Sequence, residues 1–144
     1  MRIVLQRVSS ASVTVDGAVT GKIGIGYLVL LGVASGDTKA DAKRLAEKVV
    51  NLRIFADEND KTNLSLRDVN GGILVISQFT LYADCRKGNR PNFMAAGSPE
   101  LANELYEYFK EVCREHIPIV ESGVFGADMK VELLNDGPFT VILE

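Results

Sequence analysis

The sequence predicts an α+β fold: a mixed, largely antiparallel β-sheet with a barrel-like core and two main helices packed on it. Three observations predict this fold. Runs rich in β-branched residues occupy both ends of the chain, two internal stretches repeat apolar residues at helical spacing, and turn residues separate these segments. The expected order is four strands, a helix, a strand, a helix and three strands. No linker or repeat divides the 144 residues, so we expect one domain spanning residues 1–144.

The first third of the chain is predicted to be β-structure. Branched residues recur from Arg2 to Ile23, and Asp16-Gly17 between two such runs is a strong signal for a two-residue hairpin. The run from Gly26 to Ala34 is continuously apolar, which is typical of a strand covered on both faces.

An amphipathic helix is predicted between Asp37 and Leu52, with Asp37 or Thr38 as its N-cap and Asp41 in its first turn. The residues that share its apolar face are Ala42, Leu45, Ala46, Val49 and Leu52. Residues 56–72 are polar, acidic and rich in turn residues, so we expect an excursion over the surface. A buried strand at 73–79 follows.

A second helix is predicted to begin at Ser98, with Pro99 in its first turn, and to end before Pro118. Its apolar face comprises Leu101, Leu105, Tyr108 or Phe109, and Val112. The remaining residues are interpreted as three short strands, broken at 122–128 and at 135–138. The outermost strands of such a sheet need cover, so we expect a homodimer that continues or stacks the sheets.

Composition limits the classes of partner. The net charge of -3 argues against wholesale coating by nucleic acid, so any RNA-binding surface has to be local. The apolar residues between Arg2 and Arg7 are too few for a signal peptide or a membrane span. Cys85 and Cys113 show neither a CxxC pair nor the spacing of metal ligands. We therefore expect a cytoplasmic protein with no metal, no cofactor and no membrane association.

The stretch SQFTLYADCRKGNRPNF at residues 77–93 is the first candidate for chemistry, because polar side chains at a strand end run into a basic loop. Packing is the simpler interpretation, with Phe79 in the core and the hydroxyl groups of Ser77 and Thr80 bonded to strand-end backbone groups. The cations of the loop can follow a phosphate backbone, although solvated charge is the commoner explanation of a basic run. These cations are Arg86, Lys87 and Arg90.

The single histidine does not supply an obvious catalytic base. His116 lies at the end of the second predicted helix, where a cation suits the negative end of the helix dipole. A Ser-His-Asp triad would have to use it, and nothing in the sequence places it near Ser77 or Thr80. The second candidate segment, residues 135–138, is on its own an ordinary turn of the Asp-Gly and Gly-Pro kind.

Four segments together resemble the D-aminoacyl-tRNA deacylase family. They are SQFTLYAD at residues 77–84, NDGPFT at 135–140, the opening RxxxxRVxxASV at 2–13 and FGADM at 125–129. The resemblance extends from end to end of the chain. One position departs from it, because Phe139 stands where the family often has Val after the Gly-Pro pair.

The resemblance implies a proofreading hydrolase that acts at the 3′ acceptor end of aminoacyl-tRNA. It implies hydrolysis of the ester that joins a D-amino acid, or achiral glycine, to the terminal adenosine, with L-aminoacyl-tRNA rejected. It also implies a homodimer in which the Gly137-Pro138 pair, joined by a cis peptide bond and braced by Arg7, enters the pocket of the other subunit. Selection would then be steric exclusion of L-residues.

The resemblance further implies a site built around residues 77–80. Ser77 and Gln78 would line the adenosine and aminoacyl pocket, and backbone N–H groups near Phe79 would stabilise the oxyanion. The 2′-hydroxyl of the adenosine would help to activate water, while an older alternative makes Thr80 the nucleophile. Phe125 and Met129 would form walls of the pocket, or would simply pack in the core. The three cations of the basic loop, Arg86, Lys87 and Arg90, would contact acceptor-stem phosphates.

Two functions of other classes stay open on the sequence. A non-catalytic RNA-binding module would need the basic loop but not the Gly137-Pro138 geometry. A hydrolase of small esters or amides would use Thr80 as its nucleophile and would not need tRNA.

Overall fold

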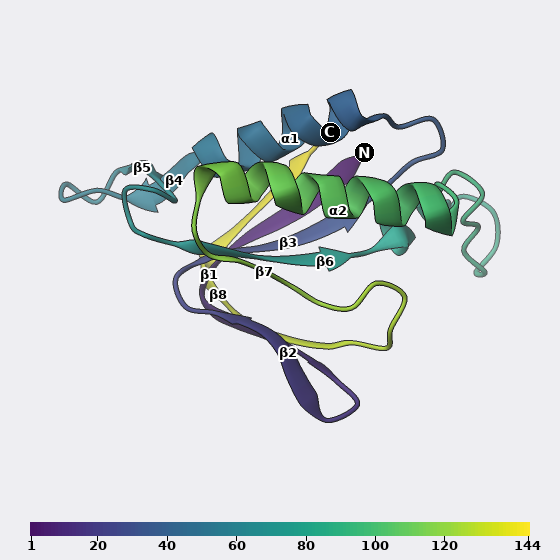
Figure 1. Cartoon of the computed structure of the whole chain (residues 1–144), viewed down its shortest axis with the longest axis horizontal. Coiled ribbons are helices and arrows are strands. Elements are labelled where there is room, and N and C mark those ends of the chain that lie inside the picture. Colours follow the sequence, from purple (N-terminus) through teal and green to yellow (C-terminus); the bar gives the residue numbers. More distant parts are fainter.

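The computed structural model describes residues 1–144, and in it two helices lie together over one face of a curved sheet (Figure 1). The helices are α1 (Lys39–Asn51), α2 (Pro99–His116) and a short 3-10 helix, η1 (Phe79–Tyr82). The strands are β1 (Arg2–Val15), β2 (Ala18–Ile23), β3 (Gly26–Gly32), β4 (Arg53–Ala56), β5 (Thr62–Ser65), β6 (Gly72–Ser77), β7 (Val120–Ser122) and β8 (Lys130–Leu143). Neither long helix contains an apolar stretch of the length that crossing a membrane requires.

Strand β1 organises the sheet. One of its edges pairs with β8 along almost its whole length, and the other pairs first with β3 and then with β2, all antiparallel. Strands β3, β6 and β7 continue the sheet in parallel pairs. The sheet curls until β2 approaches β7, where a Cβ added at Gly21 would lie 2.7 Å from the carbonyl oxygen of Ser122. The predicted fold class, a mixed and largely antiparallel sheet with a barrel-like core and two helices, is confirmed.

The core forms between the sheet and the two helices. Strand β3 is buried along its length apart from Leu30, which confirms a strand covered on both faces. The predicted hairpin is also confirmed: Asp16 and Gly17 join β1 to β2 with φ angles of 49° and 81°. Positive φ at both turn positions is the geometry that an Asp-Gly pair favours.

Both long helices begin at the residues that the predicted N-caps indicate. Thr38 precedes α1, and the Asp41 carboxylate accepts a hydrogen bond of 2.8 Å from the Thr38 backbone N–H. Ser98 precedes α2, and its hydroxyl oxygen accepts a hydrogen bond of 3.2 Å from the Leu101 N–H. On α2 the buried aromatic side chains are Tyr106 and Phe109, whereas Tyr108 is only partly buried and packs at the edge of the core.

The order of strands differs from the prediction in three places. Before α1 there are three strands and not four, because β1 runs unbroken for 14 residues. The polar segment after α1 is not only a surface excursion, since β4 and β5 pair as a small hairpin. After α2 there are two strands and not three, because β8 continues through the predicted break at residues 135–138.

Strand β8 passes that break as a bulge. Gln6 pairs with Thr140 and Val8 pairs with Asn135, so residues 136–139 lie opposite Arg7 alone. Two side chains hold the bulge: Arg7 donates from Nε to the carbonyl oxygen of Asp136 at 3.0 Å, and the Asn135 amide oxygen accepts from the Phe139 N–H at 2.8 Å. These two hydrogen bonds from side chains replace the backbone hydrogen bonds that the bulge interrupts. Pairing of β8 with β1 therefore resumes at Thr140.

Candidate functional site

A groove opens where β6 ends, between η1 and the first turn of α2. Its cavity measures about 420 Å³ and is largely apolar. The lining residues are Val33, Ser77, Phe79, Phe93, Ala96, Gly97, Pro99, Ala102, Phe125 and Gly126. The groove is therefore built from segments that are far apart in the sequence.

A smaller cavity of about 250 Å³ lies beside the groove and shares Ser77, Phe79 and Gly126 with it. Gln78 and Met129 line this second cavity. The structure thus gathers five of the sequence candidates around one site: Ser77, Gln78, Phe79, Phe125 and Met129.

Phe79 stands between the two cavities. Its side chain is 53% exposed, which is unusual for phenylalanine, and its ring meets that of Phe93 edge to face with centroids 5.1 Å apart. The simple packing interpretation, with Phe79 in the core, is therefore wrong. An exposed aromatic pair at the mouth of a groove offers an apolar surface to a ligand.

The backbone at the start of η1 has two donors without a partner in the chain. The Gln78 N–H donates to the carbonyl oxygen of Leu31 at 2.8 Å and so continues the pairing of β6 with β3. The N–H groups of Phe79 and Thr80 come next and donate to no acceptor within the chain, because the first residues of a helix have no preceding carbonyl to bond. Two neighbouring N–H groups of this kind can bind an oxygen that carries negative charge.

No side chain that lines the groove can act as a general base. The Thr80 hydroxyl accepts a hydrogen bond of 2.6 Å from the Gln78 amide, and neither histidine nor carboxylate lines the groove. His116, at the last residue of α2, lies 2.8 Å through Nδ1 from a guanidinium nitrogen of Arg67. Asp128 lines the smaller cavity, but it forms an ion pair with Lys130 at 3.1 Å.

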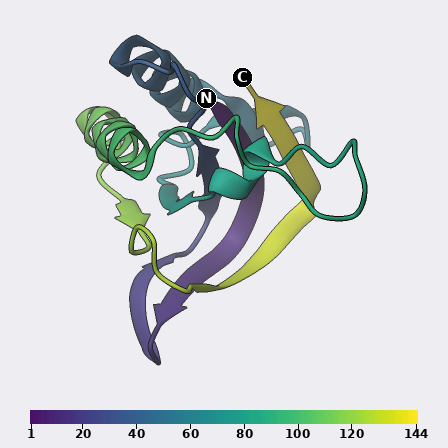
Figure 2. The same cartoon turned by 90° about the vertical axis from the view of Figure 1, so that its right-hand side faces the viewer.

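The basic loop follows η1 and projects from the body of the molecule (Figure 2). Asp84 and Asn92 close it with two backbone hydrogen bonds of 2.7 and 3.0 Å. Arg86 donates to both carboxylate oxygens of Asp84, at 2.9 and 2.6 Å, and this hydrogen bonding lowers the pKa of Asp84 to about 2. Lys87 and Arg90 are exposed and form no ion pair within the chain. Their charges are free to meet a polyanion.

The Gly137-Pro138 pair forms the exposed tip of the bulge in β8, and its peptide bond is cis. Arg7 supports the bulge from below, with its guanidinium 4.7 Å from the centroid of the Phe139 ring and a second hydrogen bond of 2.7 Å to the Ile54 carbonyl. The carbonyl that Arg7 contacts in the bulge is that of Asp136, one residue before the pair. The pair is thus held in place while remaining open to solvent.

The structure does not bring the Gly137-Pro138 pair to the groove of its own chain. On β3, Arg7 is paired with Tyr27, whereas Ser77 is paired with Leu31 on the opposite edge. Four residues along a strand correspond to about 13 Å. Neither cavity at Phe79 includes a residue of the bulge.

Sequence reasoning missed the wall of the groove formed by Phe93, Ala96 and Gly97. The segment after the basic loop, NFMAAG at residues 92–97, is apolar, and this change of polarity was a usable signal. The loop returns to the groove because the Gly97 N–H donates to the Val33 carbonyl at 2.8 Å.

The chain is similar to known proteins along nearly its whole length. The model of the family described as D-Tyr-tRNA(Tyr) deacylase matches residues 4–144. A curated D-aminoacyl-tRNA deacylase of Clostridium beijerinckii is 58% identical over 144 residues, which cover 100% of this chain and 97% of the relative. One from Thermosipho africanus is 56% identical with the same coverage. A solved structure of a protein described as c-Myc DNA unwinding element binding protein superposes with a TM-score of 0.94 at 42% identity, covering 100% of this chain and 98% of the other.

Proposed function

The chain belongs to the D-Tyr-tRNA(Tyr) deacylase family, and from this premise we propose that it proofreads chirality by clearing both D-aminoacyl-tRNA and mischarged glycyl-tRNA. The activity is that of an ester hydrolase, in agreement with the names of its curated relatives. Hydrolysis of the ester at the terminal adenosine releases free tRNA and the amino acid.

The observation that carries the mechanism is a groove with two free backbone donors and no titratable side chain. Ester hydrolysis passes through a tetrahedral intermediate whose oxygen becomes negative, and the Phe79 and Thr80 N–H groups are suited to hold that oxygen. A water molecule bonds to the carbonyl carbon, and the bond to the ribose oxygen breaks. The proton of the water passes through the neighbouring 2′-hydroxyl of the adenosine to the departing oxygen. The substrate thus supplies the proton relay that the groove lacks.

Thr80 as a nucleophile is the alternative mechanism, and the hydrogen bonding speaks against it. Its hydroxyl oxygen already accepts from Gln78, the groove contains no base that could remove its proton, and the Asp128 carboxylate of the smaller cavity is paired with Lys130. We assign Thr80 and Gln78 to positioning, and Ser77, Phe125 and Met129 to the walls that hold the adenosine and aminoacyl groups.

For chiral selection we propose a homodimer in which the Gly137-Pro138 pair of one subunit enters the groove of the other. Three features support this arrangement. The pair is exposed, it lies away from the groove of its own chain, and the free edge of β8 carries apolar side chains in solvent. Leu134 is 62% exposed and Ile142 65% exposed. A rigid turn inserted at the groove excludes an L side chain by contact and leaves room for a D side chain or for glycine.

The basic loop supplies the contact with the rest of the tRNA. We assign Arg86, Lys87 and Arg90 to acceptor-stem phosphates, which carry no sequence information and fix the position of the substrate. We propose that the reaction takes place in the cytoplasm, where the free thiols of Cys85 and Cys113 are stable.

A panel of three substrates tests the proposal. We expect deacylation of D-tyrosyl-tRNA and glycyl-tRNA and no deacylation of L-tyrosyl-tRNA above the spontaneous rate. Glycyl-tRNA is the decisive substrate. A pocket that only excludes L side chains accepts glycine, because glycine has no side chain. A pocket that recognises a D side chain does not hydrolyse glycyl-tRNA. Refusal of glycyl-tRNA contradicts the exclusion mechanism, and refusal of D-tyrosyl-tRNA contradicts the proposed activity itself.

A further inference from the structure

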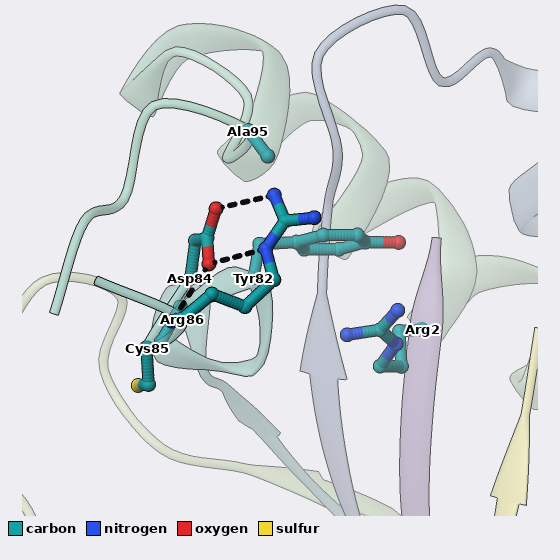
Figure 3. A pocket seen from close by; sticks show the side chains of 7 residues that line it. Arg2, Tyr82, Asp84, Cys85, Arg86 and Ala95 are labelled. Carbon is teal, nitrogen blue, oxygen red and sulfur yellow. Dashed lines mark hydrogen bonds and ion pairs between the residues drawn. The ribbon is translucent and has the colours of Figure 1, made fainter.

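A third hollow, of about 550 Å³, lies at the end of η1, where Tyr82 lines it (Figure 3). The side chains that matter in it are those of Arg2, Tyr82, Asp84, Arg86 and Ala95. None of the steps proposed above uses Arg2 or Tyr82. The hollow therefore has no role in ester cleavage as such.

The hollow is next to the groove in the chain and in space. Helix η1 begins with Phe79, which lines the groove, and ends with Tyr82, which lines the hollow. On the opposite wall, Ala95 lines the hollow and Ala96 lines the groove. A strand of RNA whose last nucleoside occupies the groove can place the preceding nucleotide in the hollow.

Arg2 is fixed in the hollow and keeps donors free. It donates from Nη1 to the Leu81 carbonyl and from Nε to the Glu144 carboxylate, both at 2.7 Å, and its guanidinium lies 4.9 Å from the centroid of the Tyr82 ring. Its Nη2 group has no acceptor in the chain. Arg86 is held in the same way by Asp84 and keeps Nη1 without an acceptor.

Two anchored guanidinium groups beside an aromatic ring are a combination that suits one nucleotide. Guanidinium groups bind phosphate through several N–H donors, and they do so at a lower entropic cost when they are already held in place. An aromatic side chain packs against a base of any sequence. The cavity is large enough for a base together with its phosphate.

We propose that this hollow binds the nucleotide that precedes the terminal adenosine of the substrate, with its base against Tyr82 and its phosphate at the free Nη groups of Arg2 and Arg86. In this assignment Arg86 contacts the single-stranded 3′ end, and Lys87 and Arg90 remain with the acceptor-stem phosphates. The inference rests on the proposed function and adds a statement about the substrate: the enzyme recognises the single-stranded 3′ end of RNA, and not an isolated aminoacyl-nucleoside.

The first test uses the wild-type protein and needs no variant. Affinities for adenosine, for the dinucleotide CA and for the trinucleotide CCA are measured by calorimetry. We expect CA to bind about tenfold more tightly than adenosine, since stacking of one base on an aromatic ring has about this effect. Equal affinity of adenosine, CA and CCA overturns the inference.

The second test uses hydrolysis and compares D-tyrosyl-CCA with D-tyrosyl-adenosine. In Tyr82→Leu, and separately in Arg2→Gln, the ratio of kcat/KM for the longer substrate to that for the shorter one should fall about tenfold. Tyr82→Phe keeps the ring and should keep the ratio. Lys61→Gln removes an exposed charge in the connection between β4 and β5, a hairpin of which no residue lines the hollow, and should leave the ratio unchanged.

A ratio that stays constant in Tyr82→Leu and Arg2→Gln overturns the inference, as does an equal fall in Lys61→Gln. Failure of the proposed function looks different, because the wild type would then hydrolyse neither substrate. A wild type that hydrolyses both with the same kcat/KM contradicts the subsite alone.

Discussion

At the scale of single residues, the proposed mechanism depends on backbone atoms more than on side chains. The Phe79 and Thr80 N–H groups are free because η1 begins there, and no replacement of their side chains removes these donors. Side chains around them, such as Gln78 and Thr80, bond to each other at 2.6 Å. With this mechanism, loss of the Thr80 hydroxyl should reduce activity less than loss of the 2′-hydroxyl of the substrate.

We therefore expect Thr80→Ala to lower kcat by about fivefold, the effect of one positioning hydrogen bond. A D-tyrosyl-tRNA with a 2′-deoxy terminal adenosine should lose about 10²–10⁴-fold in kcat, the usual contribution of a proton relay, while it still binds. Single-turnover kinetics separate the two effects. Thr80→Ser is the matched control. Abolished activity in Thr80→Ala with recovery in Thr80→Ser, and full activity on the deoxy substrate, would make Thr80 the nucleophile.

At the scale of elements, α2 is the part that connects stability to the site. Pro99 and Ala102 in its first turns line the groove, and Tyr106 and Phe109 further along are fully buried against the sheet. Tyr106 also donates through its hydroxyl to the carbonyl of Val75 in β6 at 3.0 Å. The first turn of α2 therefore both carries the Ser98 cap and forms part of the groove wall.

Ser98→Ala should lower the free energy of unfolding by about 1 kcal/mol, because the Leu101 N–H loses its acceptor at the helix start. Ser98→Asp offers a carboxylate oxygen in the same place and should unfold at or near the wild-type urea concentration. Equilibrium urea denaturation measures both variants. Equal stability of Ser98→Ala and the wild type would show that water replaces the cap without cost.

At the scale of the whole molecule, two parts of the proposed site lie apart in one chain. The bulge of β8 holds Gly137 with φ of 139°, and a Cβ added there would lie 3.1 Å from the Arg7 guanidinium and 3.2 Å from the Phe139 nitrogen. Gly137→Ala therefore strains the bulge without touching the groove of its own chain. Ala96→Trp fills the groove, which residue 96 lines, and leaves the bulge of its own chain intact.

These two variants allow a test of a composite site by subunit mixing. Each homodimer should lose most of its activity. A purified heterodimer of Gly137→Ala with Ala96→Trp contains one site with both parts intact, and should recover about half of the wild-type activity.

The matched control for this mixing experiment pairs a wild-type subunit with one that carries both substitutions. If the parts come from different subunits, both of its sites are damaged and it should be inactive. If each subunit has its own complete site, the control keeps half of the activity and the mixed single variants recover none. A fully active monomer in sedimentation at the assay concentration would also exclude the composite site.

The sequence alone determined what depends on neighbours in the chain. Capping by Thr38 and Ser98, the Asp16-Gly17 turn, the apolar β3 and the fold class are all local or periodic signals, and the structure bears them out. The motifs at residues 77–84 and 135–140 were sufficient to indicate the family, because a short run of residue types carries that information.

The tertiary structure decided what depends on pairing across the chain. Strand β8 continues through Gly137-Pro138 because Arg7, on a strand about 130 positions earlier in the sequence, bonds to the carbonyl of Asp136. Phe109 is buried more deeply than Tyr108 because of how α2 lies on the sheet. Phe93 returns to the groove next to Phe79 because backbone hydrogen bonds between Asp84 and Asn92 close the loop. Periodicity cannot specify such contacts, since they depend on which segments the fold brings together and not on the order of residues within one segment.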